Sequence, residues 1–130
     1  MLSAARLQTL VLTSDAVRAG RFYTDVLGLR LVGQSLGALL YDVGGADLRV
    51  SPVPSTAPSE HTVLGFAVES LDDAISDLKA RGVRFERFAN FPHDEDGAVA
   101  APDGSRVIWF RDPDGNLLSV VQYGGPVSAT

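Results

Sequence analysis

Two stretches of the chain, residues 7–28 and 62–82, follow the same plan. Each begins with an apolar strand-like run, continues through a Ser/Asp turn into an amphipathic helical pattern, and ends at a glycine. The offset between the turn residues Asp15 and Asp72 is 57 residues. A repeat of this length is a supersecondary unit that cannot bury its own hydrophobic face. We therefore expect two units to pack together and a site to form on the surface between them.

The ends of the two helices are the best-marked positions in the sequence. In the first unit, Ser14 or Asp15 can supply the oxygen that caps the helix, and Gly28 suits the left-handed conformation that ends it. In the second unit, Ser70 has the capping position and Gly82 the terminal one. These signals predict one amphipathic helix in each repeat.

Strand patterns follow each helix, and a proline-rich linker, Pro52–Ser59, separates the units. The expected strands after the helices are Leu29–Gly33, Ala38–Val43 and Asp47–Ser51 in the first unit, and Arg84–Phe88, Ser105–Phe110 and Leu117–Gln122 in the second. Each unit is thus predicted to be βαβββ. The chain is expected to be a single α+β domain over residues 1–130, with module one at about 6–52 and module two at about 61–123.

Composition excludes several classes of function. The chain has 130 residues, enough for one domain with a core of its own. Lys and Arg number 11 against 16 Asp and Glu, so the net charge of −5 argues against binding to nucleic acid. The absence of cysteine excludes disulfides, thiolate catalysis and Cys-bound zinc. Without a signal peptide or an apolar run of about 20 residues, we expect a cytoplasmic protein that makes no membrane contact.

Two local sequences carry a resemblance to a known family. Phe-Tyr-Thr-Asp-Val-Leu-Gly-Leu at 22–29 and Trp-Phe-Arg-Asp-Pro-Asp-Gly-Asn at 109–116 resemble the first helix and the last hairpin of the vicinal oxygen chelate superfamily, also called the glyoxalase/bleomycin-resistance/dioxygenase family. The resemblance extends from about residue 6 to 123. It implies two βαβββ modules whose eight strands curve into a cup, with helices outside and the ligand inside. It also implies a homodimer.

The resemblance further implies where a divalent metal would be held, because enzymes of this family use one ligand from each of four strands. The matching positions here are Gln8, Arg49, Val63 and Ser119. Valine has no lone pair, serine is neutral, and a guanidinium repels a dication, so only Gln8 could coordinate. If the register slipped, Asp47 could add a carboxylate without repairing the other positions. We therefore expect no metal and no other cofactor.

Strand alternation assigns the candidate ligand-binding residues to one face of each strand. In residues 63–68 the bulky side chains share the face expected to cover the helix, and the small ones share the face that leaves room for a ligand. Trp109 and Phe110 alternate, so one of them can face the ligand. The predicted lining residues are Gln8, Leu10, Arg49, Val63, Gly65, Ala67, Trp109 and Ser119.

Other chemistry-bearing residues have plainer explanations. His61 shares the face of Val63 nearer the rim, and a lone histidine is more often structural than catalytic. The loop around His93 is acidic but lacks calcium-loop spacing, which favours a solvated loop and leaves a role as a lid open. Asp112 and Asp114 are expected to cap N–H groups in a turn.

Three functions remain. The first, which we favour, is a metal-free binding protein that holds a small apolar or aromatic molecule, with Arg49 suited to an anionic or carbonyl-bearing ligand. The second is a glyoxalase-like lyase or dioxygenase with unusual metal ligands. The third is an accessory dimeric protein whose cup is vestigial.

Overall fold

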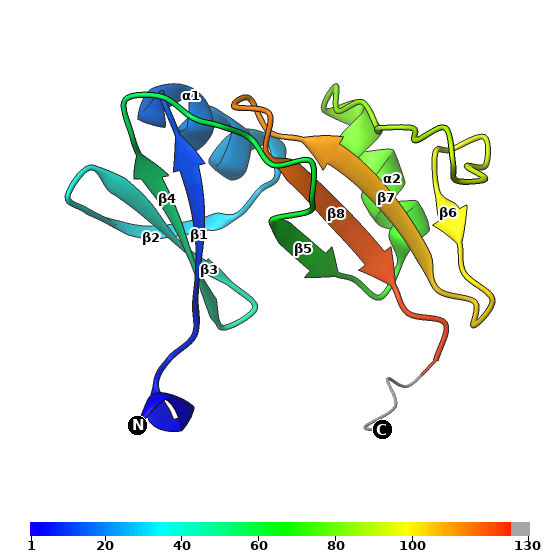
Figure 1. The fold of residues 1–130 in the computed structure, drawn as a ribbon, viewed down its shortest axis with the longest axis horizontal. Coiled ribbons are helices and arrows are strands. Elements are labelled where there is room, and N and C mark those ends of the chain that lie inside the picture. The colour runs from blue at the N-terminus through cyan, green and yellow to red at the C-terminus, as the bar shows by residue number, and fades with distance from the viewer. Residues whose placement is uncertain (126–130) are drawn as a thin grey trace. The chain divides into compact units, whose positions relative to one another are not determined.

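The repeat is present as two units with the same order of elements (Figure 1). The computed structural model describes residues 1–125. Unit 1 comprises Met1–Pro58 with the turn Asp112–Gly115, and unit 2 comprises Ser59–Arg111 with the chain from Asn116 onward. After a short helical turn at Leu2–Ala4, unit 1 contains β1 (Gln8–Thr13), α1 (Ala16–Gly20), β2 (Arg30–Ser35), β3 (Ala38–Val43) and β4 (Ala46–Pro52). Unit 2 contains β5 (Leu64–Ala67), α2 (Leu71–Ala80), β6 (Val99–Ala100), β7 (Arg106–Arg111) and β8 (Leu117–Gln122).

Each unit builds a four-stranded mixed sheet with the same topology. The strand orders are β1-β4-β3-β2 and β5-β8-β7-β6. The first strand of each unit pairs in parallel with the last, and the other neighbours are antiparallel. The expected α+β class with two βαβββ modules is therefore confirmed. Among residues 1–125, no helix has the length and apolarity needed to span a bilayer.

The helix ends lie where the sequence predicts them. Asp15 accepts a hydrogen bond from the Arg18 amide at 3.1 Å, and Ser70 Oγ accepts one from the Asp73 amide at the same distance. Gly28 and Gly82 have φ of 69° and 84°, a left-handed conformation that L side chains rarely adopt. One detail was not predicted: α1 continues through Arg21–Val26 as a turn of π-helix. Such turns are rare in proteins.

Alternating burial along the strands places the core of each unit on one side of its sheet. In β1, Val11 and Thr13 are buried, whereas Leu10 and Leu12 are 54% and 45% exposed. In unit 2, α2 covers its sheet with the buried side chains of Leu71, Ile75 and Leu78, and the strands contribute Ile108, Phe110, Leu118 and Val120. The opposite face of each sheet is left accessible for binding.

The turn that follows β7 is bonded to the helical segment of unit 1. Asp112 accepts a hydrogen bond from the Tyr23 hydroxyl at 2.7 Å and another from the Asp114 amide. Asp114 in turn accepts from the amide and hydroxyl of Ser14 and pairs with Arg18 at 3.2 Å. Burial and the Asp112 charge raise the pKa of Tyr23, so its hydroxyl remains a donor. The two aspartates are turn residues, as predicted, but they also bond to residues about 90 to 100 positions away.

The expected strand Arg84–Phe88 is wrong. A backbone hydrogen bond from the Glu86 amide to the Trp109 carbonyl at 2.7 Å connects this segment to β7. The strand itself, β6, lies later in the chain. Side chains take over the hydrogen bonds that a strand would make: Phe88 donates its amide to the His93 ring, and Arg87 bonds two loop carbonyls. Residues 83–98 therefore form an ordered excursion from the sheet.

Candidate functional site

The accessible face of the unit 2 sheet is formed by the small side chains that alternation assigned to it. Gly65 and Ala67 in β5 are exposed, while the alternating residues Leu64 and Phe66 are half-buried. Gly65 pairs with Ser119 of β8, and Ser119 pairs with Trp109 of β7. Because directly paired residues share a face, these three lie in one row across the sheet. A Cβ added at Gly65 would lie 3.1 Å from Ser119 Oγ, so the row has little space for larger side chains.

A pocket of about 300 Å³ opens beside this row, within unit 2. Its walls are aromatic where they meet β7, and its other residues are polar apart from one leucine. The lining residues are Glu60, His61, Thr62, Phe88, Asn90, Phe91, Trp109 and Leu117. A concave site with apolar walls and a few polar groups is the usual form of a small-molecule site.

The aromatic wall consists of three rings in mutual contact. The rings of Phe91 and Trp109 stack, with centroids 5.7 Å apart and planes 21° from parallel. Phe88 meets Trp109 edge-to-face, with centroids 5.3 Å apart. Phe91 is 46% exposed, so its ring presents apolar surface to solvent. Such a wall offers stacking surfaces to a flat or apolar ligand.

Of the eight predicted lining residues, Trp109 alone is among those that line the pocket. Val63 lies just before β5, is 39% exposed, and donates its amide to the Leu117 carbonyl at 2.9 Å. Gly65, Ala67 and Ser119 lie further along the same sheet. Their role in binding stays a prediction.

Sequence reasoning missed most of the pocket wall. Phe88, Asn90 and Phe91 belong to the excursion that was expected to be a strand and a loop. The signal was present as a phenylalanine at every third position from Phe85 to Phe91. His61, expected at the rim or in the linker, lines the pocket beside Glu60.

The unit 1 sheet presents a different face. Gln8 and Leu10 of β1 pair with Asp47 and Arg49 of β4, so these four residues are neighbours on it. Arg49 donates from Nε to Ser51 Oγ at 3.2 Å and from Nη2 to the Ser35 carbonyl at 3.1 Å. In the described part of the chain, no carboxylate pairs with this guanidinium. Its charge is therefore available to an anionic ligand.

The family's metal positions do not offer a fitting donor set. In unit 1 the carboxylate beside Gln8 is that of Asp47, which forms an ion pair with Arg6. The hydrogen bond from Arg6 lowers the pKa of Asp47 and occupies its oxygens. In unit 2 the corresponding residues are Val63 and Ser119, which bring no anionic or imidazole ligand. A divalent metal needs several anionic or imidazole ligands, so the absence of a metal at these positions stays a prediction.

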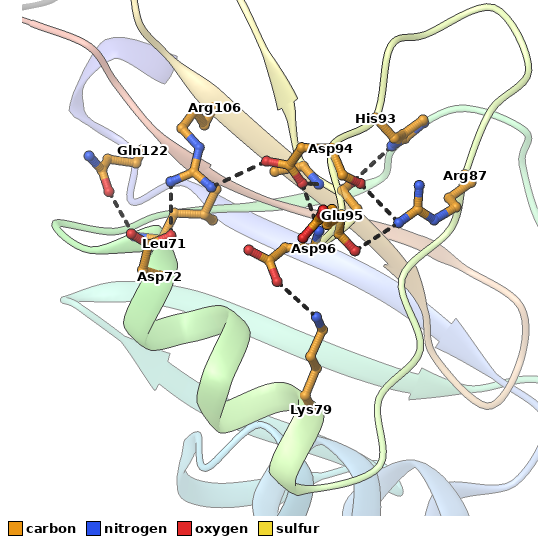
Figure 2. Close-up of polar contacts among 12 residues, drawn as sticks. Leu71, Asp72, Lys79, Arg87, His93, Asp94, Glu95, Asp96, Arg106 and Gln122 are labelled. Atoms are coloured by element: carbon orange, nitrogen blue, oxygen red, sulfur yellow. Dashed lines mark hydrogen bonds and ion pairs between the residues drawn. The ribbon is translucent and has the colours of Figure 1, made fainter.

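The acidic residues of the loop around His93 are exposed, as the sequence suggested, and the loop is also fastened by hydrogen bonds and ion pairs. Asp94 accepts hydrogen bonds from the Asp96 and Ala98 amides, and Asp96 pairs with Lys79 (Figure 2). Burial would raise the pKa of Asp94, but these backbone hydrogen bonds and the charge of Arg106 outweigh it and lower the pKa. Asp94 and Asp96 thus help to hold the loop in place. Over residues 1–125, no three His, Asp or Glu side chains gather as a metal site would require.

Comparison with known proteins agrees with this architecture. The model of the Glyoxalase/Bleomycin resistance protein/Dioxygenase superfamily matches residues 6–120. The uncharacterized protein YraH of Bacillus subtilis is 30% identical over 129 residues, covering 88% of this chain and 94% of YraH.

Solved structures show the same fold at lower identity. A lactoylglutathione lyase from Agrobacterium tumefaciens has a TM-score of 0.69 at 21% identity and covers 92% of this chain and 93% of its own. A superfamily member from Sphaerobacter thermophilus has a TM-score of 0.72 at 22% identity and covers 94% and 99%. With two βαβββ modules and a family match over most of its length, the chain belongs to the glyoxalase/bleomycin resistance protein/dioxygenase superfamily.

Proposed function

We propose that this protein binds a small, largely apolar or aromatic molecule without a metal ion and without chemical conversion. The observation that carries the proposal is the aromatic pocket of unit 2, where Phe91 stacks on Trp109 and Phe88 meets the same indole edge-to-face. A ligand ring that joins this group gains stacking energy in addition to buried area.

The poor metal site supports binding over catalysis of the family's metal-dependent kind. Metal-dependent reactions need a cation that polarises substrate oxygens, and the positions that would hold it carry an amide, a guanidinium, an isopropyl group and a hydroxyl. Sequestration of an intact ligand needs only shape and apolar surface.

Arg49 marks a separate candidate site on the sheet face of unit 1, which would suit a ligand with an anionic or carbonyl group. Its guanidinium is held by Ser51 and the Ser35 carbonyl, which leaves Nη1 to donate to a ligand oxygen. Replacing Arg49 by Ala should weaken an anionic ligand bound at this unit 1 face by about 1–3 kcal/mol and leave its uncharged analogue unaffected. An equal effect on both compounds would remove the arginine from the site.

The experiment that tests the proposal is a ligand screen read by the chain's single tryptophan, Trp109. Aromatic carboxylates, neutral aromatics, antibiotics and glutathione adducts are titrated against its emission. Hits are confirmed by thermal unfolding, where a ligand at a hundred times its Kd should add about 2.7 kcal/mol. We expect saturable quenching by at least one aromatic class. Gly65→Leu tests whether the ligand also contacts the accessible sheet face beside the pocket. It should lower affinity while circular dichroism stays unchanged. Unchanged affinity would restrict the site to the pocket.

A metal titration tests the alternative, a metal-dependent lyase or dioxygenase. Purified protein is titrated with nickel and zinc, and bound metal is measured after dialysis. We expect no stoichiometric binding, and tight binding of one ion per chain would overturn the metal-free proposal. The homodimer expected of the family stays a prediction, which light scattering can check.

A further inference from the structure

We propose that His93 is the positioning residue of the aromatic pocket: it holds the pocket wall through both ring nitrogens, so the wall opens when the imidazole gains a proton. The inference concerns the unliganded protein, and only its consequence for affinity rests on the proposed function. His93 stands behind the wall, with its ring centroid 6.1 Å from those of both Phe88 and Trp109.

The hydrogen bonds fix the protonation state that the wall requires. The Phe88 amide lies 2.8 Å from Nε2, and an amide can only donate, so Nε2 accepts. Nδ1 lies 2.7 Å from the Gly97 carbonyl, which can only accept, so Nδ1 carries the hydrogen. The ring is thus a neutral bridge between the start and the end of the excursion. An imidazolium has N–H on both nitrogens and would turn a hydrogen toward the Phe88 amide in place of a lone pair.

The rest of the loop is fastened independently of this bridge, as Figure 2 shows. Arg106 pairs with Asp94 at 3.6 Å and with Asp72 at 2.9 Å, and Lys79 pairs with Asp96 at 3.2 Å. Those contacts hold the far end of the loop on α2 and β7. Loss of the Phe88–His93 bond should therefore release the wall while the loop stays attached.

Charged groups of both signs surround His93. Three acids, Asp94, Glu95 and Asp96, lie on the same loop as His93. Three bases lie around that loop: Arg87 from the same excursion, Lys79 from α2 and Arg106 from β7. Further along the excursion and β7, Glu86 pairs with Arg111. At the pocket stand Glu60 and the chain's other histidine, His61. The hydrogen-bond geometry at the two ring nitrogens therefore decides which form of the ring the wall accepts.

The wall should consequently be closed in neutral solution and open in mild acid. Imidazole is the side chain that ordinarily changes charge between about pH 5 and pH 8. As the pH falls through that range, Trp109 should become accessible to solvent. Ligand affinity should fall about fivefold, the factor expected for one hydrogen bond of ordinary strength.

The test measures acrylamide quenching and the emission maximum of Trp109 from pH 8 to pH 5, in the full chain without ligand. We expect quenching to increase and the emission to shift to the red, with far-UV circular dichroism constant. The matched variants are His93→Gln and His61→Gln. His93→Gln retains an acceptor and a donor at this position but does not titrate, so this variant should abolish the transition and keep the wall closed. The glutamine at 61 should leave the transition intact.

Several results would overturn the proposal. The transition could persist in His93→Gln or vanish in His61→Gln, which would assign it elsewhere. A fall in emission intensity without greater acrylamide access would mean that the imidazolium only quenches the indole. A parallel change in circular dichroism would mean global unfolding. Failure to find any ligand would count against the proposed function and leave this titration unaffected.

Discussion

The two units differ most in the segment that follows the helix. In unit 1 the chain enters a six-residue strand, β2, directly after Gly28, whereas in unit 2 it leaves the sheet after Gly82 and returns as the two-residue β6. The excursion carries Phe88 and Phe91, which complete the pocket with Trp109. The candidate site has therefore formed where the second copy of the repeat departs from the first. The sheet topology that both units share supports the site, and the excursion of unit 2 supplies its aromatic side chains Phe88 and Phe91.

The strongest test of this comparison replaces matching core leucines. Leu48 in β4 and Leu118 in β8 are 3% and 0% exposed. Replacing either by Ala should lower the free energy of unfolding by about 2–5 kcal/mol, because each change leaves a cavity in a packed sheet. Denaturant unfolding measures both. A much smaller loss at one position would show that the two sheets are not equivalent supports.

The next test concerns the polar contact in the core of unit 1. Tyr23→Phe removes the hydroxyl that bonds Asp112 and leaves a buried carboxylate oxygen without that donor. We expect a loss of about 1–3 kcal/mol in unfolding free energy. Tyr123→Phe is the control, because Tyr123 is 53% exposed, and it should have no measurable effect. Equal stability of the two variants would make the Tyr23 contact dispensable.

A smaller effect, on ligand affinity, should distinguish the excursion of unit 2 from β2, its counterpart in unit 1. Phe91→Ala removes the ring stacked on Trp109 and should weaken an aromatic ligand by about 1 kcal/mol, roughly fivefold in Kd. Val32→Ala in β2 removes a 53% exposed side chain from the corresponding segment of unit 1 and should leave Kd unchanged. Calorimetric titration compares them. Matching losses would end the assignment of the site to unit 2.

The smallest expected effect is a pH dependence of stability that arises from the turn Asp112–Gly115 of unit 1. Burial would raise the pKa of Asp114, but hydrogen bonds from Ser14 and the charge of Arg18 outweigh it and lower the pKa. A lowered pKa in the folded protein stabilises it above about pH 4, and this contribution disappears as the pH falls further. Asp114→Asn should thus cost about 0.2–1 kcal/mol at pH 7 and progressively less below pH 4. A difference that is constant with pH would contradict the assigned charge effect.

Local signals in the sequence were sufficient for most of the fold. The helix boundaries depend on neighbouring residues, so their sequence positions predicted them. The side chains of Asp15 and Ser70 accept hydrogen bonds from N–H groups of the first turn, and the helices end at Gly28 and Gly82. Alternation placed Gly65 and Ala67 on the accessible face of β5 because the side-chain period of a strand is fixed at two. The strand Arg84–Phe88 failed because the Phe88 amide donates to the His93 ring and the Arg87 side chain donates to two loop carbonyls, contacts that strand alternation does not predict.

The sequence by itself determined the duplicated βαβββ plan and the faces of the strands, and the absence of metal-ligating residues stays a prediction from it. These follow from contacts within a few residues or from side-chain chemistry alone. The tertiary structure decided where a ligand-sized space exists. Phe88 and Phe91 meet Trp109 from a segment whose backbone donates to the His93 ring and accepts from the Arg87 side chain. Such a wall depends on hydrogen bonds between segments that fold back on each other, and its geometry is not encoded in any one stretch of sequence.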